Sequence, residues 1–142
     1  MNILKTPTKK EALQLIVDNW DDVYASTQGQ NIINEIHLCG HFGLKYVDMN
    51  GFDGVDKENG EKIELKTTDA RTCGRAQWNS CGSNKALADW FIFWCKITGQ
   101  WAKVSNSQVQ KNVNASGGIK ARLSDNPGGR SKRMKTSSSW FK

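Results

Sequence analysis

The stretch "GFDGVDKENGEKIELKTT", residues 51–68, decides the fold because two short strand patterns flank a turn within it. Asn59-Gly60 is a typical turn pair of a β-hairpin. In the second strand Ile63 and Leu65 alternate with charged residues, so one face is apolar and the other is charged. Strands are usually poor in Asp, Glu and Lys. The pattern therefore predicts a β-hairpin whose charged face has a functional role.

The charged face carries Glu64 and Lys66, which a strand places about 6.6 Å apart on one side. Asp53 stands on the partner strand or just before it, so pairing brings the two acids and the lysine together. Two carboxylates and the Leu65 carbonyl form the hard oxygen site that Mg²⁺ prefers. Such a metal polarises a phosphate and lowers the pKa of the attacking water. The alternative is a solvated hairpin with surface salt bridges, each contributing about 0–1 kcal/mol.

Residues before the hairpin have helical patterns. Residues 8–25 open with a capping box from Thr8 to Glu11, which predicts a helix. The apolar positions of that helix recur on one face; they are Leu13, Ile16, Val17, Trp20 and Val23. Residues 30–43 predict a second helix with Gly40 as a stop signal, and residues 44–49 predict a strand.

The chain after the hairpin predicts further strands and a basic end. Residues 69–84 are polar and rich in Gly and Ser, which predicts a long loop. Residues 89–97 are nearly continuously apolar, as in a buried central strand. Another strand over 101–106 and a short helix capped by Ser105 or Ser107 follow. We expect one α/β or α+β domain, with N-terminal helices in 1–43, a catalytic core in 44–114 and a DNA-binding end in 115–142.

Composition is that of a globular chain of 142 residues, 24% charged and 37% hydrophobic. No apolar run reaches about 18 residues, so no membrane span is expected, and the start lacks a signal-peptide pattern. The cysteines show no CxxC pair and are expected to be reduced thiols in a cytoplasm; they are Cys39, Cys73, Cys81 and Cys95.

Charge is concentrated at one end of the chain. Residues 1–114 contain equal numbers of basic and acidic residues, so the formal net charge of +6 lies in 115–142. A basic segment of this kind is typical of nucleic-acid binding. The alternative is a solubilising or disordered tail.

The segment "FDGVD…GEKIELKTT" resembles the signature of PD-(D/E)xK nucleases, with Asp53 as the first acid and Glu64-Leu65-Lys66 as the ExK. Within that family it is most similar to type II restriction endonucleases. The resemblance implies a restriction-endonuclease-like core, in which helices flank a central mixed β-sheet. It also implies a Mg²⁺ cofactor that Mn²⁺ can replace and Ca²⁺ mimics without catalysis, a double-stranded DNA substrate, and a homodimer joined through the N-terminal region.

The resemblance also places base contacts in the loop after the ExK strand. Arginine can fork onto guanine, and Asn or Gln onto adenine, in the major groove; the candidates are Arg71, Arg75, Gln77 and Asn79. Trp78 is expected either to stack on bases or to lie in the core. Phosphate contacts are predicted at the basic end, at Arg130, Lys132, Arg133 and Lys135. For the candidates in the loop after the ExK strand, the alternative is a plain surface loop.

Further acids and a histidine pair complete the candidate residues. Asp56 is either a second metal ligand or an acid that stabilises the hairpin, and Glu35 on the second helix is a possible additional acid. His37 and His41 share a helical face, and with Cys39 they are candidate ligands of a structural zinc. Packed or hydrogen-bonded histidines are the ordinary alternative.

These observations predict a Mg²⁺-dependent DNA endonuclease, cytoplasmic and encoded by a bacterium or phage. A homing endonuclease or junction resolvase would share the active site, and a non-catalytic nucleic-acid-binding domain would share the basic end. Because one D…ExK centre cuts one strand at a time, cutting a symmetric site calls for two chains related by a two-fold axis. We expect a homodimer with the helix over 8–25 in its interface; a monomer that nicks is the alternative.

Overall fold

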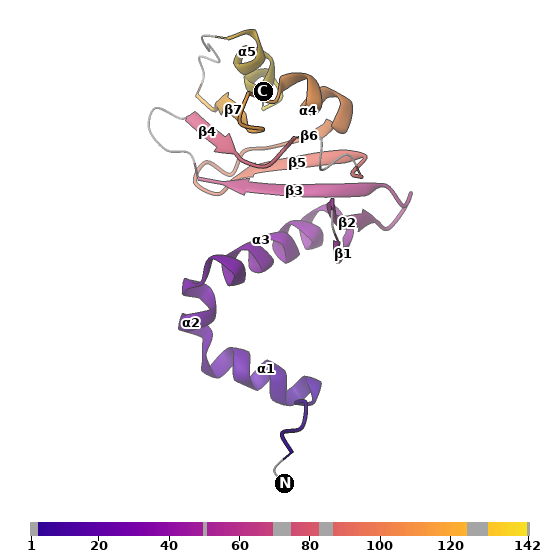
Figure 1. Ribbon diagram of the computed structural model, residues 1–142, viewed down its shortest axis with the longest axis vertical. Helices are drawn as coiled ribbons and strands as arrows, with labels where there is room; N and C mark the ends of the chain where they lie inside the picture. Colours follow the sequence, from indigo (N-terminus) through magenta and orange to yellow (C-terminus); the bar gives the residue numbers. More distant parts are fainter. Residues whose placement is uncertain (1–2, 50, 70–74, 83–86, 125–130, 142) are drawn as a thin grey trace. The chain divides into compact units, whose positions relative to one another are not determined.

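The computed structural model describes residues 3–49, 51–69, 75–82, 87–124 and 131–141. The chain divides into two compact units, Met1–Asn34 and Glu35–Lys142. Figure 1 shows the elements in chain order. They are α1 (Lys9–Asp18), α2 (Trp20–Ala25), α3 (Thr27–Phe42), β1 (Leu44–Met49), β2 (Phe52–Asp56), β3 (Lys62–Thr68), β4 (Arg75–Trp78), β5 (Trp90–Cys95), β6 (Trp101–Ser105), α4 (Asn106–Asn112), β7 (Ile119–Arg122) and α5 (Lys132–Ser139). Among the described residues, no helix is long and apolar enough to cross a membrane.

The N-terminal unit begins with the capping box that the sequence predicts. The Thr8 hydroxyl accepts a hydrogen bond from the Glu11 main-chain N–H, and the Glu11 carboxylate accepts one from the Thr8 N–H. The prediction of one helix over 8–25 is wrong at Asn19, where α1 ends and α2 begins. The Asn19 side-chain amide donates to the Leu15 carbonyl at 2.9 Å. Asparagine competes in this way with the helical main chain, and so it favours helix ends.

Helix α3 runs two residues further than its predicted stop. Gly40 lies inside the helix, and the chain leaves it at Gly43, whose φ is +68°. A left-handed residue after the last turn is a common helix terminator, and glycine adopts that conformation without strain. The strand predicted over 44–49 follows immediately as β1.

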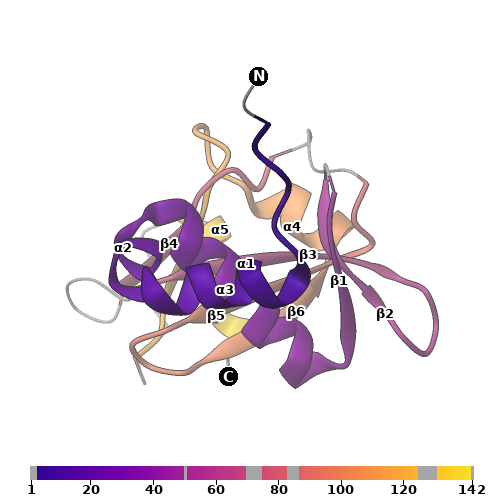
Figure 2. The same cartoon turned by 90° about the horizontal axis from the view of Figure 1, so that it is seen from below.

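The central sheet has five strands in the order β1-β2-β3-β5-β6. The predicted hairpin is confirmed, because β2 and β3 pair antiparallel with Gly54 opposite Ile63 and Val55 opposite Lys62. Strand β5 lies parallel to β3, and β6 is antiparallel to β5. Figure 2 shows β1 and β2 next to each other at one side of the sheet. The fold is therefore mixed α+β, with a central mixed sheet flanked by helices, as predicted.

The two faces of β3 lie in different surroundings. Ile63 and Leu65 belong to a core cluster that also contains Leu38 and Cys39 of α3. Glu64 and Lys66 are the register partners of Phe91 and Phe93 on β5, two rings of the other cluster. The acids and the lysine thus lie on the side of the sheet opposite to α3.

A second, two-stranded sheet was missing from the sequence prediction. Strands β4 and β7 pair antiparallel, with Arg75 opposite Arg122 and Trp78 opposite Ile119. Residues 75–78 fall inside the predicted loop over 69–84, so that prediction is wrong there. Their partner strand is more than 40 positions away in the sequence, and local patterns do not reveal such pairing.

Helix α5 binds the second sheet through two buried serines. The Ser138 hydroxyl accepts from the Arg122 N–H at 2.9 Å, and the Ser137 hydroxyl donates to the Lys120 carbonyl at 2.5 Å. The ring of Phe141 stacks on Trp78 with centroids 5.1 Å apart. The described part of the basic end is thus a packed helix, which argues against the alternative of a disordered tail.

Candidate active site

A buried hydrogen bond joins the two halves of the predicted acid motif. Oδ2 of Asp53 accepts from the Leu65 main-chain N–H at 2.8 Å. The β2–β3 register, continued by one residue, places Asp53 opposite Glu64. The carboxylate of the first acid is therefore held against the main chain of the ExK strand.

Both carboxylates are buried, although charged groups seldom are. Asp53 is 8% exposed and Glu64 is 7% exposed. Burial of a carboxylate is costly unless the charge is matched by hydrogen bonds, a counter-ion or a metal. Lys66, two residues along the same face, is half-buried. The sequence prediction of two acids and a lysine gathered at one hairpin agrees with this arrangement.

The charges of Glu64 and Lys66 both affect the pKa of the Cys81 thiol. Burial raises the pKa of Cys81 to about 11; the Lys66 ammonium lowers this pKa and the Glu64 carboxylate raises it. Coulombic effects of this kind need charges near the thiol. Strands β3 and β4 are in contact, so the segment that follows β4 lies near the ExK strand, which sequence reasoning did not foresee.

The thiol of Cys39 marks a second group of acids. Burial raises its pKa to about 11, and the carboxylates of Asp53 and then Glu35 raise it further. Gly54 permits this approach of α3, because a Cβ there would lie 3.3 Å from the Cys39 sulfur. Oε2 of Glu35 accepts from the Tyr46 hydroxyl at 3.2 Å. Glu35, the predicted additional acid, is thus bonded to β1 at Tyr46.

Asp56 has a local structural task in the hairpin. Its Oδ1 accepts from the main-chain N–H groups of Glu58 at 2.8 Å and of Asn59 at 3.3 Å. An aspartate that binds the main chain two residues on is a common turn-forming device. Of the two predicted roles, these contacts match the acid that stabilises the hairpin.

The donor chemistry at the hairpin fits a hard cation. Asp53, Glu64 and the Leu65 carbonyl offer oxygen atoms, which Mg²⁺ and Ca²⁺ prefer. Two side-chain ligands with water in the other positions is a usual arrangement for Mg²⁺. Across the described residues, no group of three or more His, Cys, Asp and Glu side chains is placed to hold a metal. The predicted Mg²⁺ set of two acids and a carbonyl stays a prediction.

The histidine pair has aromatic neighbours. The His37 ring lies 5.5 Å from the Trp94 ring, and the His41 ring lies 4.7 Å from that of Phe42, centroid to centroid. Cys39 is buried in the core cluster beneath α3. These contacts match the ordinary alternative of packed histidines.

The predicted DNA contacts fall in several places. Arg75, Gln77 and Asn79 are exposed on and just after β4, and Gln77 donates to Asn79 at 2.9 Å. Trp78 is 1% exposed, so of its two predicted roles it has the one in the core. Lys132, Arg133 and Lys135 are exposed on α5. Arg71 and Arg130 lie outside the described residues.

Sequence reasoning missed Lys120 and Arg122 on β7. Within "IKAR", Ile119 and Ala121 are fully buried, while Lys120 is exposed and Arg122 partly so. This alternation is the usual strand signal, but it is only four residues long.

The comparisons with known proteins include a structural likeness. No protein-family model matches the chain, and no curated protein matches it. A solved structure described as a bacterial homing endonuclease, I-Ssp6803I, shares 12% identity, with 80% of this chain and 82% of that chain covered. The TM-score is 0.48.

Proposed function

We propose that this protein is a Mg²⁺-dependent endonuclease of double-stranded DNA, with Asp53, Glu64 and Lys66 in its active site. One observation carries the proposal: the buried Asp53 carboxylate is hydrogen-bonded to the ExK strand at Leu65. The motif resembles that of PD-(D/E)xK nucleases, and within the family it is most similar to the restriction endonuclease PvuII.

Each residue has a role that follows from its chemistry. The carboxylates of Asp53 and Glu64, with the Leu65 carbonyl, would hold the metal at the buried end of the hairpin. A bound Mg²⁺ supplies polarisation of the phosphate and a lower pKa for water. The Lys66 ammonium, on the same face as Glu64, orients the attacking water and balances negative charge that develops on the phosphate. In hydrolysis the water oxygen forms a bond to phosphorus and loses a proton, the P–O bond to one strand end breaks, and the leaving oxygen of that strand end takes up a proton.

Binding of the duplex is assigned to exposed residues near this site. Arg75, Gln77 and Asn79 would contact bases, and the cations of α5 would contact phosphates. The α5 cations are Lys132, Arg133 and Lys135, all exposed. The acids of the site serve cleavage, and the cations of α5 serve binding. Substitution of the acids should therefore change the cleavage rate, and substitution of the cations should change the affinity for DNA.

A homodimer is proposed for cutting both strands. Helix α1 has no buried residue, and Leu13, Ile16 and Val17 are 53%, 44% and 66% exposed. Apolar surface of this kind in the N-terminal unit calls for a partner. A second copy is the partner that the reaction requires, since each chain offers one D…ExK centre. Sedimentation at micromolar concentration tests this. A protein mass near the 15.9 kDa of one chain, for the free protein and for the protein part of its complex with duplex DNA, would leave the dimer without support.

Digestion of a random-sequence duplex library tests the function. We expect cleavage with Mg²⁺, none with a chelator, and sequenced ends that share a short symmetric motif. Ends within a long asymmetric motif would identify a homing-type enzyme, and cleavage confined to four-way junctions a resolvase. Binding without cleavage under Mg²⁺ and Mn²⁺ would contradict the proposal and favour a non-catalytic binding domain.

A further inference from the structure

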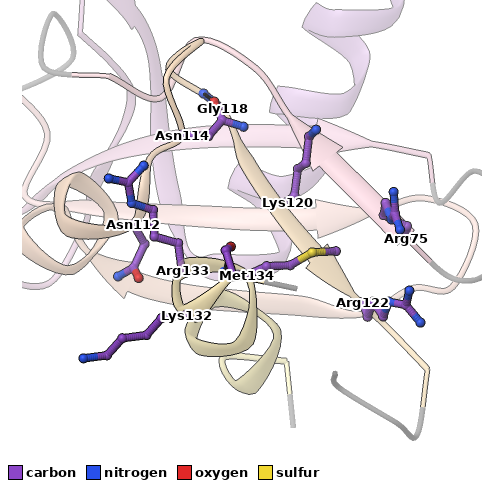
Figure 3. Close-up of a pocket in the computed structure, with 10 residues that line it drawn as sticks. Arg75, Asn112, Asn114, Gly118, Lys120, Arg122, Lys132, Arg133 and Met134 are labelled. Carbon is purple, nitrogen blue, oxygen red and sulfur yellow. Dashed lines mark hydrogen bonds between the residues drawn. The ribbon is translucent and has the colours of Figure 1, made fainter. Parts of the chain in front are cut away.

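A basic cavity of about 770 Å³ lies between the β4–β7 sheet and α5. Figure 3 shows the cationic side chains of β4, β7 and α5 around it. Its charged lining is Arg75 of β4, Lys120 and Arg122 of β7, and Lys132 and Arg133 at the start of α5. Among the described residues that line it, none is acidic. A cavity with only positive charge attracts an anion.

The strand pairing itself places like charges side by side. Arg75 is the register partner of Arg122, and Gln77 is the partner of Lys120, all on the outer face of the sheet. Like charges directly opposite each other destabilise a strand pair. An anion that contacts both arginines removes this repulsion. The like charges therefore lower the stability of the β4–β7 pair and favour the binding of an anion.

Two further features require an anionic partner at the same place. Lys132 and Arg133 occupy the first turn of α5, where the helix dipole disfavours cations and no acid is present. The Nε atom of Arg122 is buried and has no hydrogen-bond partner among the described residues. A phosphate or a base edge would supply the missing acceptor.

The shape and chemistry of the surface select duplex over single-stranded nucleic acid. The major groove of B-DNA admits a two-stranded β-ribbon, and β4 and β7 form such a ribbon, with Ala76, Trp78, Ile119 and Ala121 buried behind it. Single strands are usually held on exposed aromatic rings. No aromatic side chain is among the described residues that line the cavity.

We propose that the β4–β7 ribbon enters the major groove and that Arg75, Gln77, Lys120 and Arg122 read the base pairs. This inference deepens the proposed function and rests on its duplex substrate. Four residues per strand span about 10 Å, which matches about three base pairs at 3.4 Å each. Lys132 and Arg133 contact the phosphates that flank the groove.

The ribbon also fixes where the read bases lie relative to the cut. Strand β4 ends at Trp78, whose ring packs on that of Phe93 with centroids 5.3 Å apart, and Phe93 is the register partner of Lys66. The Cys81 N–H donates to the Gly117 carbonyl at 2.7 Å, just before β7. The end of the ribbon that carries Gln77 and Lys120 therefore lies nearer to the active site than the Arg75–Arg122 end. The bases read by Gln77 and Lys120 are accordingly the ones closest to the scissile phosphate.

A binding selection without catalysis tests the inference separately from the nuclease activity. The full chain, in Ca²⁺ and without Mg²⁺, is used to retain duplexes from a random library, and the retained DNA is sequenced. The variants are Arg75→Lys and Arg122→Lys, which keep the charge and lose the guanidinium fork, and Lys132→Ala. Lys45→Ala is the matched control, because Lys45 is an exposed strand lysine on β1, outside the cavity.

We expect the wild-type chain and the control to select the same motif of about three adjacent base pairs per half-site. Each Arg→Lys variant should lose about 10- to 100-fold preference at one position and keep the salt dependence of binding. Lys132→Ala should keep the motif and lower the salt slope by about one. A motif that survives both Arg→Lys substitutions, or no motif in the wild type, would overturn the inference. Absence of cleavage with Mg²⁺ while the motif persists would instead contradict only the proposed nuclease activity.

Discussion

Two antiparallel strand pairs carry the chemistry of this molecule, and they differ in charge, burial and sequence distance. The β2–β3 hairpin buries carboxylates, and its strands are joined by a five-residue turn. The β4–β7 ribbon exposes cations, and its strands are separated by a β-strand pair and a helix of the chain. Each pair is apolar on one side, so packing alone does not distinguish them. The difference supports the proposals that the hairpin holds a cation and that the ribbon meets a polyanion.

The largest effect is expected at the hairpin. Asp53→Asn and Glu64→Gln preserve side-chain shape and remove the charge, so both should lower the Mg²⁺-dependent cleavage rate by about 10²–10⁴-fold, the usual range for a group that assists proton transfer or charge balance. DNA binding in Ca²⁺ should change far less than cleavage. Rates on a labelled duplex measure the first, and filter binding measures the second.

The matched control for these variants is Asp56→Asn, in the same hairpin. Asparagine also forms the turn contacts that Asp56 makes with Glu58 and Asn59. This variant should cleave within a few-fold of the wild type. A loss equal to that of Glu64→Gln would mean that Asp56 belongs to the metal site and that the assignment of the hairpin acids needs revision.

A second test compares the stability contributed by the two strand pairs. Ile63 on β3 and Ile119 on β7 are both fully buried, in separate core clusters. Substitution of either by alanine should lower the free energy of unfolding by about 2–5 kcal/mol. Urea unfolding measures both. A loss below about 1 kcal/mol for Ile119→Ala alone would show that the ribbon is not packed on the sheet as described.

A third test addresses the cations of α5. Lys135→Ala should weaken binding to all duplexes alike and lower the salt slope by about one, because a phosphate contact carries no sequence information. Binding isotherms at several salt concentrations provide the slope. Lys45→Ala, with the same loss of charge, should leave the slope unchanged. Equal slopes for the two variants would remove Lys135 from the interface.

The smallest effect is a change in the titration of Cys81. Glu64 raises and Lys66 lowers the pKa of this thiol, which is about 11. Glu64→Gln should therefore lower the pH midpoint of Cys81 alkylation, and Lys66→Met should raise it, with the midpoint read for each cysteine-containing peptide. Cys39, near Asp53 and Glu35, is an internal reference and should stay constant. If the pH midpoint of Cys81 alkylation moves in neither variant, the segment after β4 does not lie near Glu64 and Lys66.

Local sequence signals explain what could be predicted. The capping box at Thr8, the Asn59-Gly60 turn and the period-two alternation around Ile63 each act within a few residues, and the structure contains all three. The acid–lysine motif was visible for the same reason, because the turn brings Asp53 and Glu64 together. The sequence also predicts an apolar, buried strand over 89–97, and the structure has β5 there.

Long-range pairing explains what was missed. The sequence predicts a loop at β4 because these residues find their partner strand only in β7, 41–47 positions away. The Ser137 and Ser138 contacts that bind α5 to β7 join residues 16–17 positions apart, also beyond the reach of local patterns. The single helix expected over 8–25 failed for a different reason: one asparagine, Asn19, competes with the helical main chain. Lys120 and Arg122 became candidates only after the ribbon placed them opposite Gln77 and Arg75.

A crystal structure of the chain with duplex DNA and Ca²⁺ tests the central claim most directly, because Ca²⁺ is expected to occupy the site without supporting cleavage. The account predicts a cation bound by carboxylate oxygens of Asp53 and Glu64 at about 2.3–2.6 Å, with a DNA phosphate as a further ligand and the Lys66 ammonium beside it. A phosphate backbone that passes the hairpin without a cation, or a cation bound by other residues, would contradict the account.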